Sequence, residues 1–150
     1  MSKTYLLDTN IISYLTNPNS PHRESIKNKL FSLSEDDTVA VSIITLYELS
    51  YGLATLKNSN NKGLFESGIT FIKEYLDIFP LHVDEIDIFG EIKAKYRQQT
   101  GINTKALKKN DLDFLIAATA ISQDVILVSN DGIFKDIAEF GFELCCESWV

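Results

Sequence analysis

The chain is poor in the residues that build disulfide scaffolds, zinc sites and phosphate-binding loops. It has only two cysteines, Cys145 and Cys146, which are adjacent, and two histidines, His22 and His82, which lie far apart. Adjacent cysteines do not form a disulfide framework, and neither histidine has a second ligand at zinc-binding spacing. We therefore expect buried or idle thiols and no zinc site. The seven glycines form neither a Gly-x-Gly-x-x-Gly pattern nor a phosphate loop, which disfavours nucleotide cofactors.

Long apolar runs and a leader-like start are also lacking. No apolar run approaches the roughly 20 residues that cross a bilayer, and Asp8 interrupts the first one. With 150 residues and 45% hydrophobic content, the chain can fill one core. We expect a single cytoplasmic domain over residues 1–150. The net charge of −7 disfavours binding to nucleic acid by bulk electrostatics, so such a partner would require a cation or a local basic patch.

Apolar patterns that alternate between strand and helix spacing predict an α/β fold. Buried strands are expected at residues 4–7, 38–43, 78–83 and 125–129, with a possible fifth at 142–146. Helices are expected near residues 11–15, 23–33, 45–56, 65–76, 84–100, 112–122 and 132–140. This alternation indicates a three-layer α/β/α architecture around a mostly parallel sheet of four to five strands. Ligands of such sheets bind beyond the carboxyl ends of the strands.

Four acidic residues fall where this fold would bring them together. Asp8 follows the first strand and Asp131 follows the fourth, while Glu48 and Asp113 lie near the starts of two helices. Each acid alone has a structural explanation as a helix cap or turn residue, and Thr45–Glu48 matches a capping box. Together, however, clustered carboxylates repel one another unless they are protonated or bridged by a cation. The arrangement favours one or two Mg²⁺ or Mn²⁺ ions at a phosphodiester-cleaving site.

Each of the four acids lies in a distinctive stretch of sequence. The stretches are Leu6–Ile12 (LLDTNII), Tyr47–Gly52 (YELSYG), Asp113–Ala118 (DFLIAA) and Leu127–Phe134 (LVSNDGIF). In this order, and across nearly the whole chain, they resemble the PIN-domain nucleases, most closely the toxin ribonucleases of VapBC toxin–antitoxin systems.

The resemblance implies a PIN-like fold and a hydrolase that cleaves RNA with Mg²⁺ or Mn²⁺. It makes Asp8, Glu48, Asp113 and Asp131 the catalytic, metal-binding quartet. It also implies a homodimer that is inhibited by a small cognate antitoxin protein. Apolar surface around five side chains could serve either protein contact: Ile12, Tyr14, Leu15, Tyr47 and Tyr51.

Further polar residues lie near the quartet in sequence. Candidates to orient the acids by hydrogen bonds are Thr9, Asn10, Thr45, Asp111 and Asn130, although caps and turns explain them equally well. Asp111 is also a rival of Asp113 for the third acidic position. The spacing to Ile116, which begins the Ile-Ala-Ala run, favours Asp113.

A basic segment precedes the third acid. Residues 93–109 contain no acidic residue and hold Lys93, Lys95, Arg97, Lys105, Lys108 and Lys109. A solvated helix face would explain such a run, but it could also steer RNA phosphates toward the acids, with Lys95, Arg97, Lys105, Lys108 and Lys109 as the contacts. Residues 101–110 lack the compact Gly-x-Pro-Ile loop that often precedes the third acid in PIN toxins, so the family pattern does not fix where RNA lies here.

Other functions of acid-rich α/β domains match less well. A haloacid-dehalogenase-like phosphatase needs Asp-x-Asp after the first strand, where this chain has Asp8-Thr9-Asn10. A response-regulator receiver needs an aspartate after the third strand, where Phe79–His82 offers none. The alternative that stays open is a non-catalytic protein-binding module with the PIN fold, although the presence of all four acids favours an enzyme.

Overall fold

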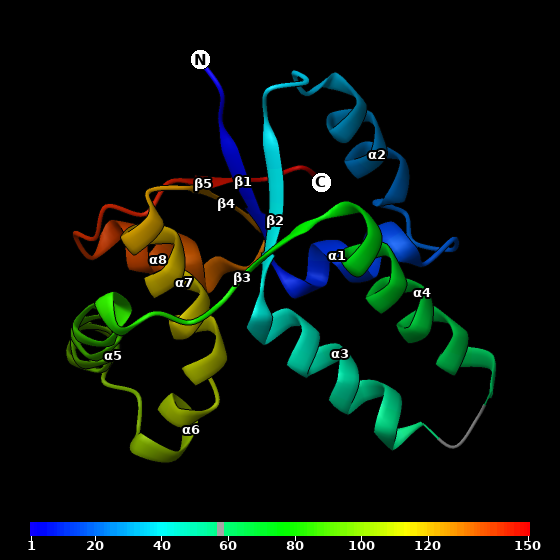
Figure 1. Cartoon of the computed structure of the whole chain (residues 1–150). Helices are drawn as coiled ribbons and strands as arrows, with labels where there is room; N and C mark the ends of the chain where they lie inside the picture. The colour runs from blue at the N-terminus through cyan, green and yellow to red at the C-terminus, as the bar shows by residue number, and fades with distance from the viewer. Residues whose placement is uncertain (57–58) are drawn as a thin grey trace.

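A computed structural model describes residues 1–56 and 59–150. Its strands are β1 (Thr4–Leu7), β2 (Thr38–Ser42), β3 (Asp77–Phe79), β4 (Ile126–Val128) and β5 (Cys146–Glu147). Its helices are α1 (Thr9–Thr16), α2 (Arg23–Ser32), α3 (Ile43–Thr55), α4 (Ser59–Tyr75), the 3-10 turn η1 (Val83–Glu85), α5 (Ile86–Thr100), α6 (Thr104–Lys108), α7 (Asp111–Gln123) and α8 (Gly132–Glu139). Figure 1 shows these elements along the chain.

The strands form one parallel sheet in the order β3-β2-β1-β4-β5. β1 is central, and Leu6 pairs with Ala40 of β2 on one side and Leu127 of β4 on the other. The chain first builds outward through β2 and β3 and then returns to the other side of β1. The direction of strand addition therefore reverses between β1 and β4, which is where such sheets bind ligands. The expected parallel α/β sheet is confirmed.

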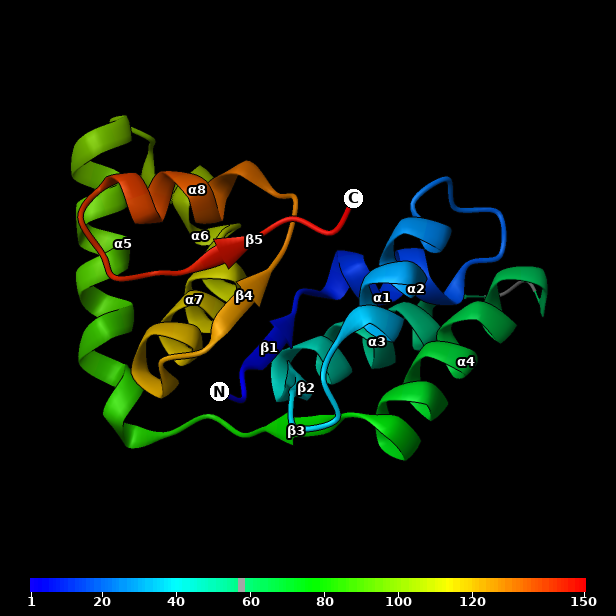
Figure 2. The ribbon, with the colours of Figure 1, turned by 90° about the horizontal axis from the view of Figure 1, so that it is seen from above.

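Helices cover both faces of the sheet (Figure 2). Because successive strand residues point to opposite faces, neighbouring residues of β1 enter different cores. Leu6 belongs to a buried cluster with side chains of α5, α7 and α8, such as Ile92, Phe114 and Ile137. Leu7 belongs to a second cluster, with side chains of α1, α2 and α4. The three layers hold β1 rigidly, and with it the residue that follows β1.

Two helix starts differ from the sequence-based expectation. α3 begins directly after β2, and its cap is Ser42, whose hydroxyl accepts a hydrogen bond from the Ile44 N–H (3.1 Å). The predicted Thr45–Glu48 capping box is therefore wrong, because Thr45 lies inside the helix. α6 occupies residues for which no helix was predicted, with Asn103 accepting a hydrogen bond from the Ala106 N–H (2.9 Å).

The strand edges also differ from the prediction. β3 is only three residues long, and the chain leaves the sheet for η1 instead of continuing to residue 83. β5 lies at Cys146–Glu147 rather than at 142–146. Both cysteines are free and exposed, so of the two expected alternatives, buried or idle thiols, the buried one is wrong. Gly101 ends α5 as expected, with φ +66°, in the left-handed region that glycine adopts without strain.

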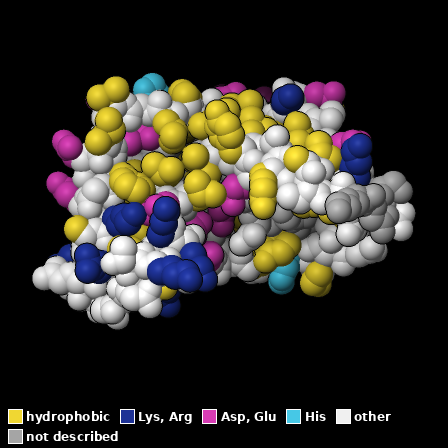
Figure 3. All heavy atoms as spheres, turned by 90° about the horizontal axis from the view of Figure 1, so that it is seen from below, with side chains coloured by type: hydrophobic (Ala, Val, Ile, Leu, Met, Phe, Trp, Pro, Cys, Tyr) yellow, Lys and Arg dark blue, Asp and Glu magenta, His cyan; other side chains and the backbone are white. Residues whose placement is uncertain are grey.

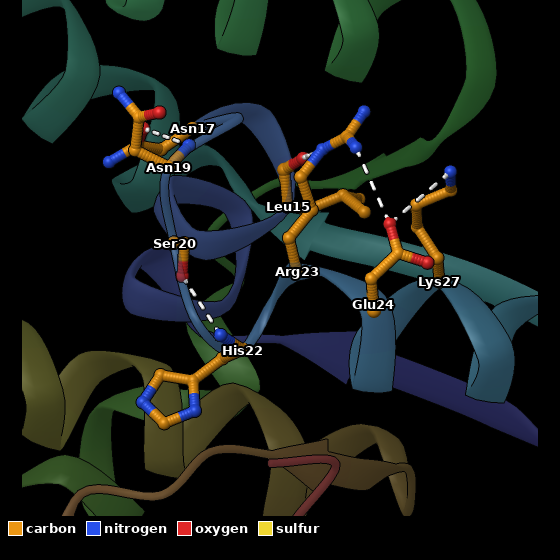
Figure 4. A network of polar contacts seen from close by, with 8 residues as sticks. All are labelled: Leu15, Asn17, Asn19, Ser20, His22, Arg23, Glu24 and Lys27. Carbon is orange, nitrogen blue, oxygen red and sulfur yellow. Dashed lines mark hydrogen bonds and ion pairs between the residues drawn. The ribbon is translucent and has the colours of Figure 1, made fainter.

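The connection from α1 to α2 is organised by short polar contacts (Figure 4). Asn17 Oδ1 accepts the Asn19 N–H (3.0 Å), and Ser20 Oγ accepts the His22 N–H (3.2 Å). Arg23 Nε then donates to the Leu15 carbonyl (3.2 Å), which ties the start of α2 to the end of α1. No helix among the described residues has the length and hydropathy to cross a membrane.

Candidate active site

Asp8 stands at the carboxyl end of the central strand. Its side chain is 4% exposed, and its Oδ1 accepts a hydrogen bond from the Thr9 N–H (2.7 Å). Its backbone N–H bonds to the carbonyl of Val128 on the neighbouring strand (3.0 Å). Asp8 therefore caps α1, as an aspartate in this position often does, but it is buried more deeply than a cap requires.

Ser129 joins the ends of β1 and β4. Its hydroxyl donates to Asp8 Oδ2 (2.9 Å) and accepts a hydrogen bond from the Asp131 N–H (3.0 Å). Asp131 in turn caps α8 by accepting the Ile133 N–H (3.1 Å), and its side chain is exposed. One buried hydroxyl thus fixes the carboxylate of Asp8 and the backbone of Asp131.

Glu48 reaches this edge of the sheet from α3. The Thr9 hydroxyl donates to Glu48 Oε1 (2.8 Å) and lies 3.0 Å from the hydroxyl of Thr45. Because a hydroxyl carries one proton, Thr45 must be the donor to Thr9 in that contact. A chain of two threonines therefore orients Glu48, and both were among the candidate orienting residues.

The start of α7 carries both rivals for the third acidic position, and they have different surroundings. Asp111 pairs with Lys93 of α5, with Nζ 2.7 Å from Oδ1. Asp113 accepts no hydrogen bond from the residues that the structure describes, although it is half-buried. Asp111 thus ties α7 to α5, while the charge of Asp113 is left uncompensated.

The electrostatics show that the four acids share one region. Burial, and then the charges of Asp8, Asp131 and Glu48, raise the pKa of Asp113 from 3.8 to about 7. Burial is also the largest cause that raises the pKa of Asp8, to about 6, against the hydrogen bonds from Ser129 and Thr9 that lower it. The negative charges of Glu48 and Asp131 raise the pKa of Asp8 further. The charges of the other three acids thus act on Asp113, and those of Glu48 and Asp131 act on Asp8, as converging carboxylates do.

The chemistry of this donor set fits a hard divalent cation. All four groups are carboxylates, which Mg²⁺ and Mn²⁺ prefer, and a cation among them would offset the repulsion that raises the two pKa values. Within residues 1–56 and 59–150, however, no three His, Cys, Asp or Glu side chains are arranged so that they could hold an ion as they stand. Binding would require the carboxylates to rotate toward a common centre.

Several other predicted residues do not have the contacts expected of them. Asn10 and Asn130 are exposed, and neither bonds to an acid within the described part of the chain. Ile12 and Leu15, expected at an apolar surface, are buried under α1 at 0% and 8% exposure, so that expectation is wrong for both. Tyr47 and Tyr51 are exposed, whereas Tyr14 is half-buried against His22.

The basic segment lies on one side of the molecule. Figure 3 shows Lys and Arg side chains gathered beside a recess that contains Asp and Glu side chains, on the side where α5 and α6 lie. Arg97, Lys105, Lys108 and Lys109 are exposed, and Lys95 is half-buried. Lys93 is already paired with Asp111, so it differs from the other five.

Ser129 is the site residue that sequence reasoning did not identify. Its partner Asp8 lies 121 residues away, so no local spacing relates the two. The only signal for it in the sequence is its position at the end of a buried strand, two residues before an acid, within the stretch that resembles the family.

Known proteins are similar to this chain in both sequence and fold. The PIN domain model matches residues 5–140. The chain is 33% identical to Ribonuclease VapC2 of Rickettsia felis over 128 residues, which cover 85% of this chain and 86% of the relative.

Two solved complexes have similar chains. A chain of VapBC2 from Rickettsia felis bound to a DNA fragment from their promoter matches with a TM-score of 0.76 and 31% identity, covering 98% of this chain and 99% of that one. A chain of VapBC-1 from nontypeable Haemophilus influenzae matches with a TM-score of 0.72 and 25% identity, covering 97% and 98%. Sequence and fold therefore agree that this chain belongs to the PIN-domain family.

Proposed function

We propose that this chain is an endoribonuclease toxin that hydrolyses RNA phosphodiester bonds in the cytoplasm with the help of Mg²⁺ or Mn²⁺. The observation that carries the proposal is the convergence of four carboxylates at the switch point between β1 and β4, two of them with raised pKa values. Membership in the PIN-domain family and the relative named Ribonuclease VapC2 support the choice of RNA as substrate.

The residues divide into those that would hold the ion and those that orient them. Asp8 and Asp113 would be the principal ligands, with Glu48 and Asp131 completing the shell. When bound, the ion would lower the pKa of a water molecule and stabilise negative charge developing on the phosphate. Ser129 orients one oxygen of Asp8 by its hydrogen bond, so the rotation that ion binding requires would fall mainly on the other carboxylates.

The exposed part of the basic segment would guide the RNA. A chain with net charge −7 repels a polyanion on average, so cations beside the acids are needed to bring phosphates close. Lys95, Arg97 and the three lysines of residues 105–109 have no ion-pair partner within the described residues. They are therefore available for phosphate contacts, whereas Lys93 is not.

Protein partners are part of the same proposal. The VapBC complexes among the structural neighbours support a small antitoxin as a partner of this chain. A cavity of about 400 Å³ between α1, α2 and α4 offers a place for it, and exposed Phe31 is among its lining residues. Arg23 and Lys27 also line it, but each pairs with Glu24 (3.7 and 3.9 Å; Figure 4), so a mainly apolar segment would complement the cavity.

A second copy of the chain would cover a different surface. Val83, Ile86, Tyr47 and Leu112 are large apolar side chains with exposures of 80%, 64%, 68% and 42%. Exposed large apolar side chains in such number typically mark a protein contact. We expect a homodimer in sedimentation experiments, and a monomer for the variant Ile86→Lys.

The activity is tested by incubating the purified protein with structured RNAs in Mg²⁺, Mn²⁺ or EDTA, beside an Asp8→Asn variant. We expect cleavage at discrete positions that is lost with EDTA and with the variant. Activity that survives both changes would contradict the proposed site. Complete silence of the folded, antitoxin-free protein would favour the alternative of a non-catalytic binding module.

A further inference from the structure

A cavity different from the one between α1, α2 and α4 adjoins the acidic site. It has a volume of about 340 Å³ and lies between the end of β4, the start of α8 and the segment around β5, which lie side by side in Figure 2. Its walls comprise Ser129, Asn130, Asp131, Gly132, Phe134, Lys135 and Cys146–Ser148. Ser129 and Asp131 also belong to the acidic site, so an occupant of the cavity would lie next to the reacting phosphate.

Some polar groups of the cavity walls already form hydrogen bonds or ion pairs within the chain. The Ser129 hydroxyl is bonded to Asp8 and to the Asp131 N–H. Glu147 Oε1 accepts from Trp149 Nε1 (3.0 Å) and pairs with Lys29 (3.5 Å). These contacts hold the walls in place and leave other groups for a ligand.

Three side chains of the cavity make no hydrogen bond or ion pair within the described part of the chain: Asn130, Lys135 and Ser148. The amide of Asn130 has two donors and an acceptor, the Ser148 hydroxyl is both, and the Lys135 ammonium donates only. The walls also carry the carboxylates of Asp131 and Glu147, which can accept hydrogen bonds from a ligand. The cavity therefore suits a ligand with mixed donors and acceptors, and any negative charge attached to it would lie near Lys135.

The edge strand beside the cavity also leaves backbone groups without a strand partner. The carbonyls of Cys145 and Glu147 accept hydrogen bonds from the Leu127 and Ser129 N–H groups of β4. In a parallel ladder the peptide groups alternate in direction, so those of the intervening Cys146 face away from β4. Because β5 is the last strand of the sheet, these groups have no strand beside them.

We propose that this cavity binds the nucleobase next to the scissile phosphate and so sets the sequence preference of cleavage. The inference rests on the proposed ribonuclease function. A base has donors and acceptors on one planar edge that an asparagine amide can match, and its attached phosphates would lie near Lys135. The volume lies at the low end of the roughly 300–1,000 Å³ typical of small-ligand sites, which suits one base better than a folded segment.

The test compares cleavage of a pool of random-sequence RNAs by the parent protein and by two cavity variants. Asn130→Ala removes the amide, and Cys146→Phe fills the cavity from β5. Asn10→Ala and Cys145→Phe are matched controls, because Asn10 and Cys145 lie outside the cavity walls. Thermal unfolding shows that each variant is folded.

We expect the parent to prefer particular bases at one position beside the cut. Asn130→Ala should reduce that preference about tenfold, the discrimination typical of one bidentate contact, while total cleavage changes by only a few fold. Cys146→Phe should slow cleavage at the preferred sites most, and both controls should keep the parent pattern.

An unchanged preference in both folded cavity variants would overturn the inference and leave the ribonuclease function intact. A parent protein that cleaves no RNA with any divalent cation would overturn both. If the cavity variants lose affinity for an antitoxin but keep the parental preference, the cavity serves a protein partner instead, and the inference also fails.

Discussion

The end of β1 and the start of α7 each present a desolvated aspartate to the same site, but they hold it differently. Asp8 is fixed by two hydrogen bonds, from Ser129 and Thr9, and its pKa is raised to about 6. Asp113 has no such bonds among the described residues, and its pKa is raised to about 7. The comparison separates one carboxylate that the sheet positions in advance from another whose charge a bound cation would balance.

The largest effect should come from replacing Asp113 while its neighbour Asp111 serves as control. Asp113→Asn removes a proposed metal ligand and should lower the cleavage rate by about 100-fold or more, without recovery at high Mg²⁺. Asp111→Asn breaks only the ion pair with Lys93 and should lower the rate by a few fold at most. Cleavage rates of the two variants are measured on the same RNA. A larger loss for Asp111→Asn than for Asp113→Asn would make Asp111 the third acid of the site.

The second effect tests whether the function of Asp8 depends on its hydrogen bond from Ser129. Ser129→Ala removes the hydroxyl that orients Asp8, and we expect a loss of about 10–100-fold in metal affinity or cleavage. Because the ligand itself stays, added Mn²⁺ should restore part of the rate. Ser129→Thr keeps a hydroxyl and should retain more activity, so equal losses in both variants would point to packing instead.

The third effect concerns stability without metal. Both folded-state pKa values lie above the ordinary 3.8, so the protonated forms stabilise the fold below about pH 4, and this stability is lost as the pH rises through about 6 and 7. Asp113→Asn should match the parent near pH 4 and exceed its free energy of unfolding by about 1–2 kcal/mol at pH 7.5, after allowance for the partial exposure of Asp113.

Urea unfolding in EDTA at several pH values measures this difference. Adding Mg²⁺ should stabilise the parent and leave the variant almost unchanged. A variant less stable than the parent at pH 7.5 in EDTA would show that a nearby positive group already compensates the charge of Asp113.

The smallest effect concerns the basic segment. Lys105→Gln combined with Lys108→Gln, in an Asp8→Asn background, should make the slope of log affinity for RNA against log salt concentration shallower, by about 0.7 for each phosphate that is no longer neutralised. Lys3→Gln combined with Lys62→Gln changes the net charge equally, away from the site. Binding isotherms at several salt concentrations distinguish the pairs, and equal slopes would remove α6 from the path of the RNA.

The sequence was sufficient to predict helices and strands that have a strong local pattern. The run Thr4–Leu7 followed by Asp8 could be recognised as a buried strand leading into a helix, and α7 by its apolar length. It was insufficient to predict short elements. α6 spans five residues, too few to show helical periodicity, and β5 spans only two. Ser42 was missed as a cap because β2 passes into α3 without any turn residue.

The same limit applies to the site. The four acids could be proposed from sequence because each lies in a distinctive stretch, but their environments could not be predicted. That Asp111 pairs with Lys93, and that Thr45 acts through Thr9, depends on side chains brought together from separate helices. Burial and mutual charge, which separate Asp113 from the exposed acids, exist only in the folded chain.

The position of β1 in the middle of the sheet also bears on how the protein is synthesised. Asp8 emerges from the ribosome first, yet its strand partner β4 and the hydroxyl of Ser129 follow more than a hundred residues later. A nascent or prematurely ended chain thus has its first acid but not the surroundings that orient it. We expect such fragments to be inert toward RNA, so that a cell translating this message meets the nuclease only as a finished product.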